Sequence, residues 1–343
     1  MPPRHPDIAQ ALGRVREVLA QTRAAHGLSA RQPLCLLVAC SGGRDSVALL
    51  GLLALLVEAD RLTLQVGHVD HGLRADSATE AEHVLALAAS LGIEAQVRRL
   101  ELDPQAPGLP ARARDARHAV LQALAERAGA HRIALAHSAT DQAETVLLNL
   151  ARGAGLRGLA GMQPVEPDAP RIRPLLGVPR GRMATLCAHL GLAFIDDPTN
   201  LDEDHPRVRV RNVVLPALAQ GRGGIEAAMA ASAVAAREAA EALYVLAQEE
   251  LAARRISRSR HRTTGWGTRP RALRIQVLRG VMADAGIGAD LVGRRALDAI
   301  DRGLCAGGAK RWDLARGHTL HVRDGVLWVA RSGSGGTPPD LAS

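Results

Sequence analysis

Aromatic side chains are scarce in this 343-residue sequence, which has three Trp, one Tyr and one Phe. A hydrophobic core must therefore be built from aliphatic residues, and the hydrophobic content of 47% is sufficient for one. The scarcity of rings also argues against nucleic-acid binding through rows of stacked aromatics. Any contact with RNA is expected to depend on charge instead.

Cysteines are few as well, and no two of them have C-x-x-C spacing. They are Cys35, Cys40, Cys187 and Cys305. This pattern argues against a disulfide framework, a zinc ribbon and an iron–sulfur site, and it is typical of a reducing compartment.

Long apolar segments are also missing. The longest apolar run, residues 47–57, contains Gly51 and is well short of the ~20 residues that a membrane span needs. The sequence does not begin with an apolar signal region. We therefore predict a cytoplasmic protein with no membrane contact.

Acidic residues are outnumbered by basic ones, 35 to 43, which gives a formal net charge of +8. A basic balance favours a polyanionic partner, although a basic composition without any such partner is the plainer alternative. The length predicts two or three domains.

The most informative stretch is residues 34–46, with the sequence LCLLVACSGGRDS. It predicts a buried strand, a tight turn at Gly42 and Gly43, and a helix that begins at the turn. Free N–H groups and the positive end of the helix dipole make such a turn suitable for an anion. The spacing matches neither the Walker pattern nor the dinucleotide fingerprint.

Strand and helix signals then alternate along the chain. After a leading helix at 7–25, we predict strands at 62–70, 93–100 and 132–136 and helices at 79–91, 111–128 and 141–150. This rhythm predicts an α/β fold with a doubly wound, mostly parallel sheet. Polar residues end several strands, so we expect one ligand site at the carboxyl edge, built from Ser41, His68, Asp70, His137 and Ser138.

The second half of the sequence is less regular. Residues 151–182 are rich in Gly and Pro and predict a flexible loop outside the core, either a plain connector or a lid beside the site. A helix is expected at 183–190, a long one at 225–251, and short strands at 312–314, 319–323 and 326–329. Asp324-Gly325 predicts a hairpin turn.

These signals define the expected domains. We predict a leading helix in residues 1–30, a catalytic domain in 31–216, a smaller basic domain of helices and short strands in 217–331, and a disordered tail in 332–343. Residues 251–283 contain nine arginines and no acidic residue. Either they form a solvated face or they contact phosphate, and we favour phosphate contact by Arg254, Arg255 and Arg258.

Two pairs of charged residues have helical spacing. Asp141 and Glu144 share a helix face, and either they complement the helix dipole or they hold a metal or a cationic group. Arg114 and Arg117 likewise either bind phosphate or lie on a solvated face. The residues alone indicate an ATP-using α/β enzyme that acts on an anionic partner, and they do not identify the reaction.

Several of these stretches together resemble the tRNA(Ile)-lysidine synthases, a family of PP-loop ATP pyrophosphatases. The matching motifs are SGGRDS at 41–46, VDHGLR at 69–74, ARDAR at 113–117, DQAETVLL at 141–148, RGAGLRGLAGM at 152–162, RPLL at 173–176 and DPTN at 197–200. They cover residues 34–216 in the family's order, and the C-terminal part is similar to the family's short form.

The resemblance implies an adenine nucleotide alpha-hydrolase-like fold and a two-step reaction. O2 of the wobble cytidine in the CAU anticodon of tRNA(Ile) attacks the α-phosphate of ATP, and pyrophosphate leaves. The ε-amine of free L-lysine then attacks C2 of the adenylated base, and AMP leaves. Mg²⁺ is expected with ATP.

The resemblance also implies roles for particular residues. Asp45 would help to hold Mg²⁺, Asp141 and Glu144 would bind lysine, and Arg114 and Arg117 would reach phosphate or the target nucleotide. The expected ATP-binding residues are Ser41, Gly42, Gly43, Arg44, Asp45, Ser46, His68 and Asp70. The expected tRNA contacts in the catalytic domain are Arg207, Arg209 and Arg211.

The sequence departs from the family pattern at four positions. Family members usually have His or Asn at the position of Ser138 and Asp at that of Thr140, and His118 and Val208 replace an aromatic and a polar residue. These departures keep alternatives open, namely a catalytically impaired tRNA-binding relative, a PP-loop tRNA thiolase or an amidotransferase-type synthetase. The thiolase would need paired cysteines and the synthetase a source of ammonia, and the sequence shows neither. The oligomeric state also stays open, a homodimer included.

Overall fold

The computed structural model divides into two compact units, residues 1–235 and 236–343. It describes residues 5–70, 77–101, 103, 106, 108–195, 206–220, 224–257, 259–288 and 291–331. The division between the units, at residues 235 and 236, falls within a long helix. We expected a domain boundary at residues 216 and 217, and that boundary stays a prediction. The predicted disordered tail at 332–343 lies outside the described residues.

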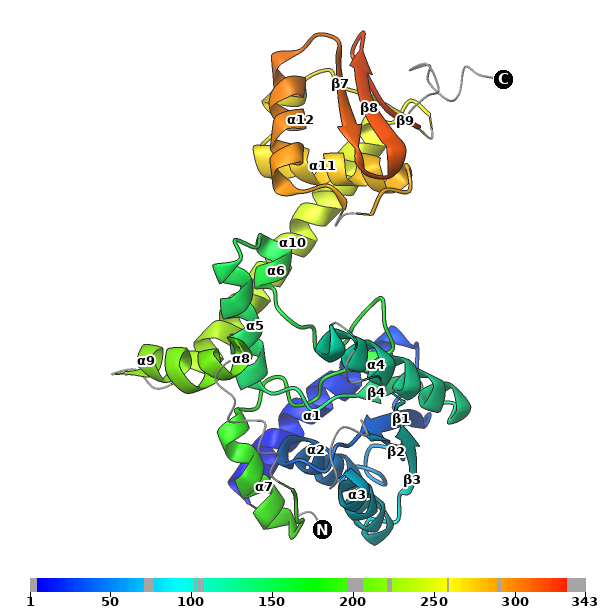
Figure 1. Cartoon of the computed structure of the whole chain (residues 1–343), viewed down its shortest axis with the longest axis vertical. Helices are drawn as coiled ribbons and strands as arrows, with labels where there is room; N and C mark the ends of the chain where they lie inside the picture. The colour runs from blue at the N-terminus through cyan, green and yellow to red at the C-terminus, as the bar shows by residue number, and fades with distance from the viewer. Residues whose placement is uncertain are drawn as a thin grey trace. The chain divides into compact units, whose positions relative to one another are not determined.

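The first unit is organised around a parallel five-stranded sheet (Figure 1). Its order is β3-β2-β1-β4-β5. The strands are β1 (Leu34–Ala39), β2 (Leu62–Asp70), β3 (Glu94–Arg99), β4 (Arg132–Ala134) and β5 (Arg171–Ile172). The chain winds outward from β1 in both directions, so a topological switch point lies between β1 and β4, next to the glycine turn. The predicted α/β fold is confirmed.

Helices cover both faces of this sheet. One face carries α1 (Pro6–Ala25), α2 (Arg44–Ala54), α3 (Ser77–Ser90) and α7 (Met183–Leu190), and the other carries α4 (Leu109–Arg127). The alternation of β1 explains this layering, because Leu36 and Val38 lie in the larger core while Leu37 packs under α4. The helix α5 (Ala139–Ala151) follows β4.

The segment 151–182 is only partly the loop that we expected. It contains α6 (Leu156–Leu159), the edge strand β5 and the 3₁₀ turn η1 (Arg180–Arg182). Ile172 and Leu175 are fully buried, so the prediction that this segment lies outside the core is wrong for this part. The strand has only two residues between Pro170 and Pro174, too few to show an alternating pattern.

Three short helical stretches follow α7 and complete the connection to the long helix. They are α8 (Pro206–Arg209), the π-helical η3 (Val210–Val214) and α9 (Leu215–Ala219). Val210 and Leu215 pack with Ala143 of α5, and this small cluster also contacts Ile225 and Met229 at the start of α10 (Ile225–Arg254). The first turns of α10 are thus fixed to α5 within the first unit.

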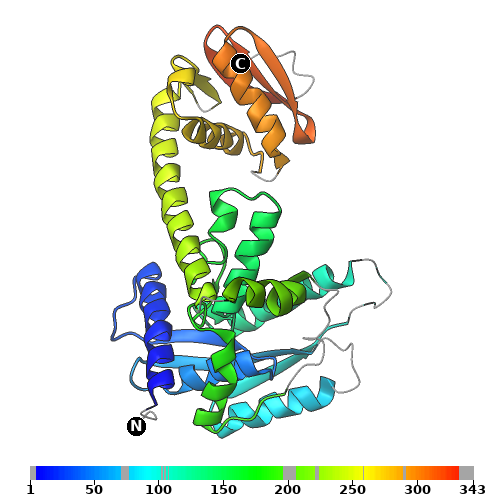
Figure 2. The same cartoon turned by 90° about the vertical axis from the view of Figure 1, so that its left-hand side faces the viewer.

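The second unit packs helices against an antiparallel sheet (Figure 2). The helices besides α10 are η4 (Trp266–Thr268), α11 (Arg271–Asp284) and α12 (Arg294–Ala306), with a 3₁₀ turn η6 at Ala315–Gly317. The sheet order is β6-β9-β8-β7, from β6 (Arg260–Arg262), β7 (Lys310–Leu314), β8 (His318–Arg323) and β9 (Val326–Arg331).

The three predicted strands of this unit are confirmed, and β6 is an addition to them. Asp324 and Gly325 have φ of 50° and 74°, as a tight hairpin turn requires. In the described part of the chain, no helix is both long enough and apolar enough to cross a membrane.

Candidate active site

The glycine turn between β1 and α2 has the geometry of a phosphate-binding loop. Gly42 has φ of +85°, which glycine adopts without strain, and a Cβ there would lie 3.4 Å from Val84 of α3. Gly43 is the N-cap of α2, so the first helical N–H groups follow it directly. The turn therefore presents backbone donors and the positive end of the helix at the carboxyl edge of the sheet.

Ser46 holds this loop in shape. Its Oγ donates to the Gly43 carbonyl at 2.9 Å, accepts from the Ser41 N–H at 3.1 Å and lies 3.2 Å from Ser41 Oγ. Ser46 is buried, whereas Ser41 is exposed. Of the two predicted ATP-binding serines, Ser41 is thus the one that faces solvent, and Ser46 braces the turn.

Two further predicted ATP-binding residues lie at the end of β2. His68 is buried and its Nδ1 lies 2.8 Å from the carbonyl oxygen of Cys40, just before the glycine turn. Asp70 is also buried, with Oδ2 3.8 Å from Arg99 Nε. His68 thus links the carboxyl ends of β1 and β2. The neighbouring motif residues 71–74 lie outside the described residues.

Asp45, on the first turn of α2, is only half satisfied. Its Oδ2 lies 3.4 Å from Nε of Arg180, while Oδ1 is buried without a hydrogen-bond partner in the described structure. Burial raises the pKa of Asp45, and the charge of Asp141 adds to this effect, although Arg180 opposes it. A buried, unpartnered carboxylate oxygen beside a phosphate-binding turn suits a hard cation such as Mg²⁺.

Asp141 serves as part of the cap of α5. Its Oδ2 accepts from the backbone N–H of Ser138 at 2.8 Å and from the hydroxyl of Ser138 at 2.7 Å. Burial alone would raise the pKa of Asp141, but these two hydrogen bonds outweigh it and the pKa is lowered. The dipole-complementing interpretation of Asp141 thus has a direct geometric basis, and Oδ1 remains for another cation.

Glu144, one turn further along, is completely buried. Its Oε1 accepts from Nε of Arg211 at 2.6 Å, and Oε2 is buried without a hydrogen-bond partner among the described residues. Burial raises the pKa of Glu144, because the bond from Arg211 only partly compensates for it. Arg211 also lies 3.7 Å from Asp141 Oδ1, so one guanidinium serves both carboxylates.

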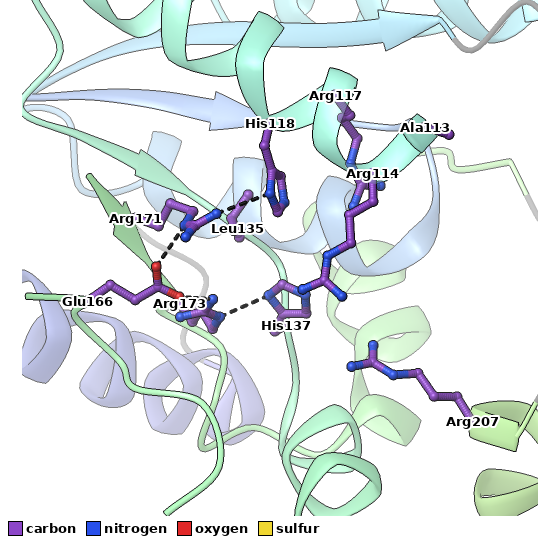
Figure 3. A pocket seen from close by; sticks show the side chains of 10 residues that line it. All are labelled: Ala113, Arg114, Arg117, His118, Leu135, His137, Glu166, Arg171, Arg173 and Arg207. Atoms are coloured by element: carbon purple, nitrogen blue, oxygen red, sulfur yellow. Dashed lines mark hydrogen bonds and ion pairs between the residues drawn. The ribbon is translucent and has the colours of Figure 1, made fainter. Parts of the chain in front are cut away.

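A cationic cavity of about 270 Å³ lies beside these carboxylates (Figure 3). Five arginines line it, together with a single carboxylate, Glu166. The arginines are Arg114, Arg117, Arg171, Arg173 and Arg207. In Figure 3, Arg114 and Arg207 approach the His137 ring from different sides, whereas Arg171 and Arg173 flank Glu166. Such a surplus of guanidinium groups suits a phosphate or another polyanion.

His137 at the floor of this cavity is neutral. Its Nδ1 accepts from Arg173 Nε at 3.1 Å. Burial lowers the pKa of His137 to about 4, and the nearby Arg173, Arg207 and Arg117 act in the same direction while Asp141 opposes them. His118 also has a lowered pKa, from burial and from Arg171 and Arg117. The cavity therefore owes its positive charge to arginine alone.

The predicted tRNA-binding arginines have very different surroundings. Arg207 lines the cavity, Arg209 is exposed, and Arg211 points inward to Glu144. Arg254 is 6% exposed, donates to the carbonyls of Arg262 and Thr264, and pairs with Glu250. Arg255 pairs with Asp284, and Arg258 lies outside the described residues. This geometry does not favour Arg211 or Arg254 as RNA contacts, and their assignment stays a prediction.

Four residues of the site had no role predicted from the sequence: Glu166, Arg171, Arg173 and Arg180. Glu166 pairs with both Arg171 and Arg173, and Arg180 reaches Asp45 from the turn after β5. Arg173 belongs to a motif that we noted without a role. A polar residue in a Gly- and Pro-rich segment carries no periodic signal, so only the unexpected strand β5 explains how these side chains reach the site.

Comparison with known proteins gives consistent results. The model of the PP-loop domain family matches residues 16–218. The tRNA(Ile)-lysidine synthase of Streptomyces coelicolor is 39% identical over 78% of this chain and 76% of its own. That of Mycolicibacterium paratuberculosis is 44% identical over 71% and 72%, and that of Mycobacterium bovis is 38% identical over 86% and 90%.

A solved structure with a similar fold is the U34-tRNA thiolase NcsA from Methanococcus maripaludis. The TM-score is 0.55 at 18% identity, and the match covers 66% of this chain and 78% of the thiolase. At this identity the likeness concerns the fold alone.

Proposed function

We propose, because this chain belongs to the tRNA(Ile)-lysidine synthase family, that it ligates free L-lysine to C2 of the wobble cytidine in the CAU anticodon of tRNA(Ile). ATP is the co-substrate, the intermediate is an adenylated cytidine, and the products are lysidine, AMP and pyrophosphate. The observation that carries the proposal is the juxtaposition, within one unit, of a phosphate-binding turn, an arginine-lined cavity and two carboxylates, the partly buried Asp141 and the buried Glu144. We further infer that the reaction takes place in the cytoplasm.

The adenylation step falls to the glycine turn and α2. Pyrophosphate would lie against the N-terminus of α2, where the backbone at Gly42 and Gly43 permits close approach. Asp45 would hold Mg²⁺ through its unpartnered Oδ1, and the ion would neutralise charge on the leaving pyrophosphate. Arg180 keeps the other oxygen of Asp45 engaged.

The cavity is suited to the phosphate of the target nucleotide or of the adenylate. Arg114, Arg117 and Arg207 come from two separate elements and surround it, while Glu166 holds Arg171 and Arg173. Removal of one such donor from a dry site typically costs on the order of 100-fold in rate. His137, which is neutral and accepts from Arg173, orients that guanidinium and is a poor base at neutral pH.

Lysine binding falls to Asp141 and Glu144. Asp141 offers Oδ1, since Oδ2 belongs to the helix cap. Glu144 is covered by Arg211, so an ammonium group that reaches it must share it with this guanidinium or displace it. The raised pKa of Glu144 suits the acceptance of the proton that the ε-amine releases when it attacks C2.

A direct assay tests this function. Protein, ATP, Mg²⁺ and radiolabelled lysine are incubated with tRNA that carries a CAU anticodon, and label on the RNA is counted. We expect ATP-dependent labelling that disappears when the anticodon cytidine is replaced by uridine. Absence of lysine-dependent label on the cognate tRNA would exclude the proposal.

Two alternatives give different results in the same experiment. A tRNA-binding relative without catalysis would release no pyrophosphate in the presence of tRNA. A thiolase would transfer sulfur, which the cysteines do not favour: Cys40 and Cys187 are buried, and burial raises the pKa of Cys187 to about 11, aided by Asp45.

A further inference from the structure

Thr140 and Glu226 form a short contact across 86 positions of sequence. The Thr140 hydroxyl donates to Oε1 of Glu226 at 2.6 Å, the length of a charge-assisted O–H···O⁻ bond. Thr140 is 5% exposed and belongs to the first turn of α5, beside Asp141. Glu226 therefore brings a carboxylate from α10 to the wall of the candidate active site.

The position of Glu226 is fixed by packing. Its neighbour Ile225 and Met229 one turn later contact the cluster of Ala143, Val210 and Leu215. Glu226 also lies in the first turn of α10, where a negative charge is favoured by the helix dipole. The start of α10 is thus held against α5, and the carboxylate does not depend on a mobile segment for its place.

Thr140 also contacts the backbone of Arg180. Its Oγ1 accepts from the backbone N–H of Arg180 at 3.2 Å, and Nε of Arg180 lies 3.4 Å from Asp45 Oδ2. A hydroxyl has one proton, so its donation to Glu226 turns the lone pairs toward Arg180 and strengthens them as acceptors. A continuous path of contacts joins Glu226 to Asp45.

We propose that Glu226 is a positioning residue of the active site, which acts through Thr140 on Arg180 and Asp45. It holds the turn at Arg180 so that the guanidinium occupies one oxygen of Asp45 and leaves the other for the cation that accompanies ATP. This inference rests on the proposed function, and it concerns the adenylation step. The affinity for tRNA is expected to be independent of the path.

The test measures tRNA-dependent pyrophosphate release at varied Mg²⁺ and ATP. Glu226→Gln keeps the shape of the side chain, and Thr140→Val removes only the hydroxyl. We expect each to lower kcat about 10-fold and to raise the Mg²⁺ concentration needed for half-maximal rate, with tRNA affinity within about two-fold. The double variant should be no worse than either single one, because both break the same path.

Matched controls separate positioning from folding. Thr140→Ser retains the hydroxyl and should restore the rate and the Mg²⁺ dependence. Glu249→Gln removes the same charge from an exposed position of α10 and should have no effect. A general loss of structure would instead lower the thermal midpoint and leave the Mg²⁺ dependence of the remaining activity unchanged.

The outcomes are decisive in both directions. Wild-type rates in Glu226→Gln, additive effects in the double variant, or an unchanged Mg²⁺ dependence would each overturn the inference. The proposed function fails separately, when the unaltered protein transfers no lysine. Pyrophosphate release by that protein would still let the role of Glu226 be measured.

Discussion

Two aspartates, one in each unit, have opposite surroundings: Asp301 is buried, and Asp45 is partly buried. Asp301 of the second unit uses both oxygens: Oδ1 accepts from Trp266 Nε1 at 3.0 Å and Arg274 Nε at 2.7 Å, and Oδ2 accepts from Arg274 Nη2 at 2.8 Å. Asp45 of the first unit has one oxygen 3.4 Å from Arg180 Nε, and the other is buried without a hydrogen-bond partner.

The pKa shifts follow this difference. Burial acts to raise the pKa of both carboxyls. At Asp301 the hydrogen bonds from Arg274 and Trp266 outweigh burial, so the pKa is lowered, whereas at Asp45 burial prevails over Arg180 and the pKa is raised. A carboxylate with hydrogen bonds to both oxygens, like Asp301, stabilises the fold. A carboxylate with one unpartnered oxygen, like Asp45, lowers the stability of the fold, and a ligand that binds this oxygen can offset the loss.

The largest expected effect is therefore on the half-bonded carboxylate. Asp45→Ala should lower tRNA-dependent pyrophosphate release by at least about 1,000-fold, because the unpartnered Oδ1 proposed to hold the cation is lost. The free energy of unfolding should change by no more than about 1 kcal/mol. The substitution removes the ion pair with Arg180, but it also removes the cost of desolvating the Asp45 carboxylate. Pyrophosphate release and thermal denaturation measure the two quantities.

Asp45→Asn is the matched control, because it keeps the size and loses the charge. It should be as inactive as the alanine variant, and both should bind tRNA within about three-fold of the unaltered protein, since phosphate contacts set that affinity. Loss of tRNA binding would mean that the glycine turn has another task. Full activity in Asp45→Asn would mean that no cation is held there.

The fully bonded carboxylate should respond in the opposite way. Asp301→Ala removes the acceptor of Nε and Nη2 of Arg274 and of the indole N–H of Trp266, and we expect a loss of roughly 3–5 kcal/mol of stability in the second unit. All three tryptophans lie in residues 236–343, so their fluorescence reports this unit selectively during urea unfolding. An unchanged fluorescence midpoint would contradict the comparison.

Acidic pH should affect the contributions of Asp301 and Asp45 to stability in opposite ways. The pKa of Asp301 is lowered from 3.8, so its stabilising effect is fully present above that value and is lost as pH falls through the lower folded pKa. The fluorescence midpoint should therefore decline below about pH 3.8, and Asp301→Asn should flatten this decline. Asp45 has a raised pKa, so its protonation on acidification relieves a cost instead.

The sequence predicts local features of this protein well. The strand, turn and helix at residues 34–54 are set by a continuous apolar run and two adjacent glycines, and the structure confirms them. The predicted helix at 141–150 is also confirmed as α5, and its capping by Ser138 and Asp141, which we did not predict, likewise involves residues three positions apart. In each case the residues that determine the geometry are neighbours in the chain.

Contacts between segments that are distant in the chain could not be predicted from the sequence. The role of Arg180 depends on β5, whose two residues give no periodic signal, and Glu226 meets Thr140 only because α10 packs on α5. Thr140 was noted as a departure from the family pattern, and the carboxylate beside it comes from another helix. A single sequence carries no signal that predicts a contact between two helices far apart in the chain.

The surroundings of the arginine run at 251–283 also depend on contacts that the run itself does not contain, and its contact with phosphate stays a prediction. The run contains no acidic residue, yet Arg254 and Arg255 pair with Glu250 and Asp284 at its two borders, and Arg274 pairs with Asp301 of α12. Arg271 pairs with Asp298 in the same way. The number of charges within a window does not distinguish a paired guanidinium from a free one, because these acidic partners lie outside the window, on α10, on α12 and at the end of α11.

The smallest expected effects concern RNA binding, and they distinguish an exposed arginine, Arg209, from an internally paired one, Arg254. Arg209 is exposed, so Arg209→Ala should weaken tRNA binding a few-fold and reduce the slope of log affinity against log salt by about 1, as loss of one phosphate contact does. Arg254→Met removes a guanidinium that lies over the Trp266 ring and is bound to Glu250 and two backbone carbonyls, so it should leave that slope unchanged. Filter binding over a salt series measures both. A reduced slope in Arg254→Met would show that this side chain leaves its internal partners to contact phosphate, and the distinction between paired and available arginines would then fail in the second unit.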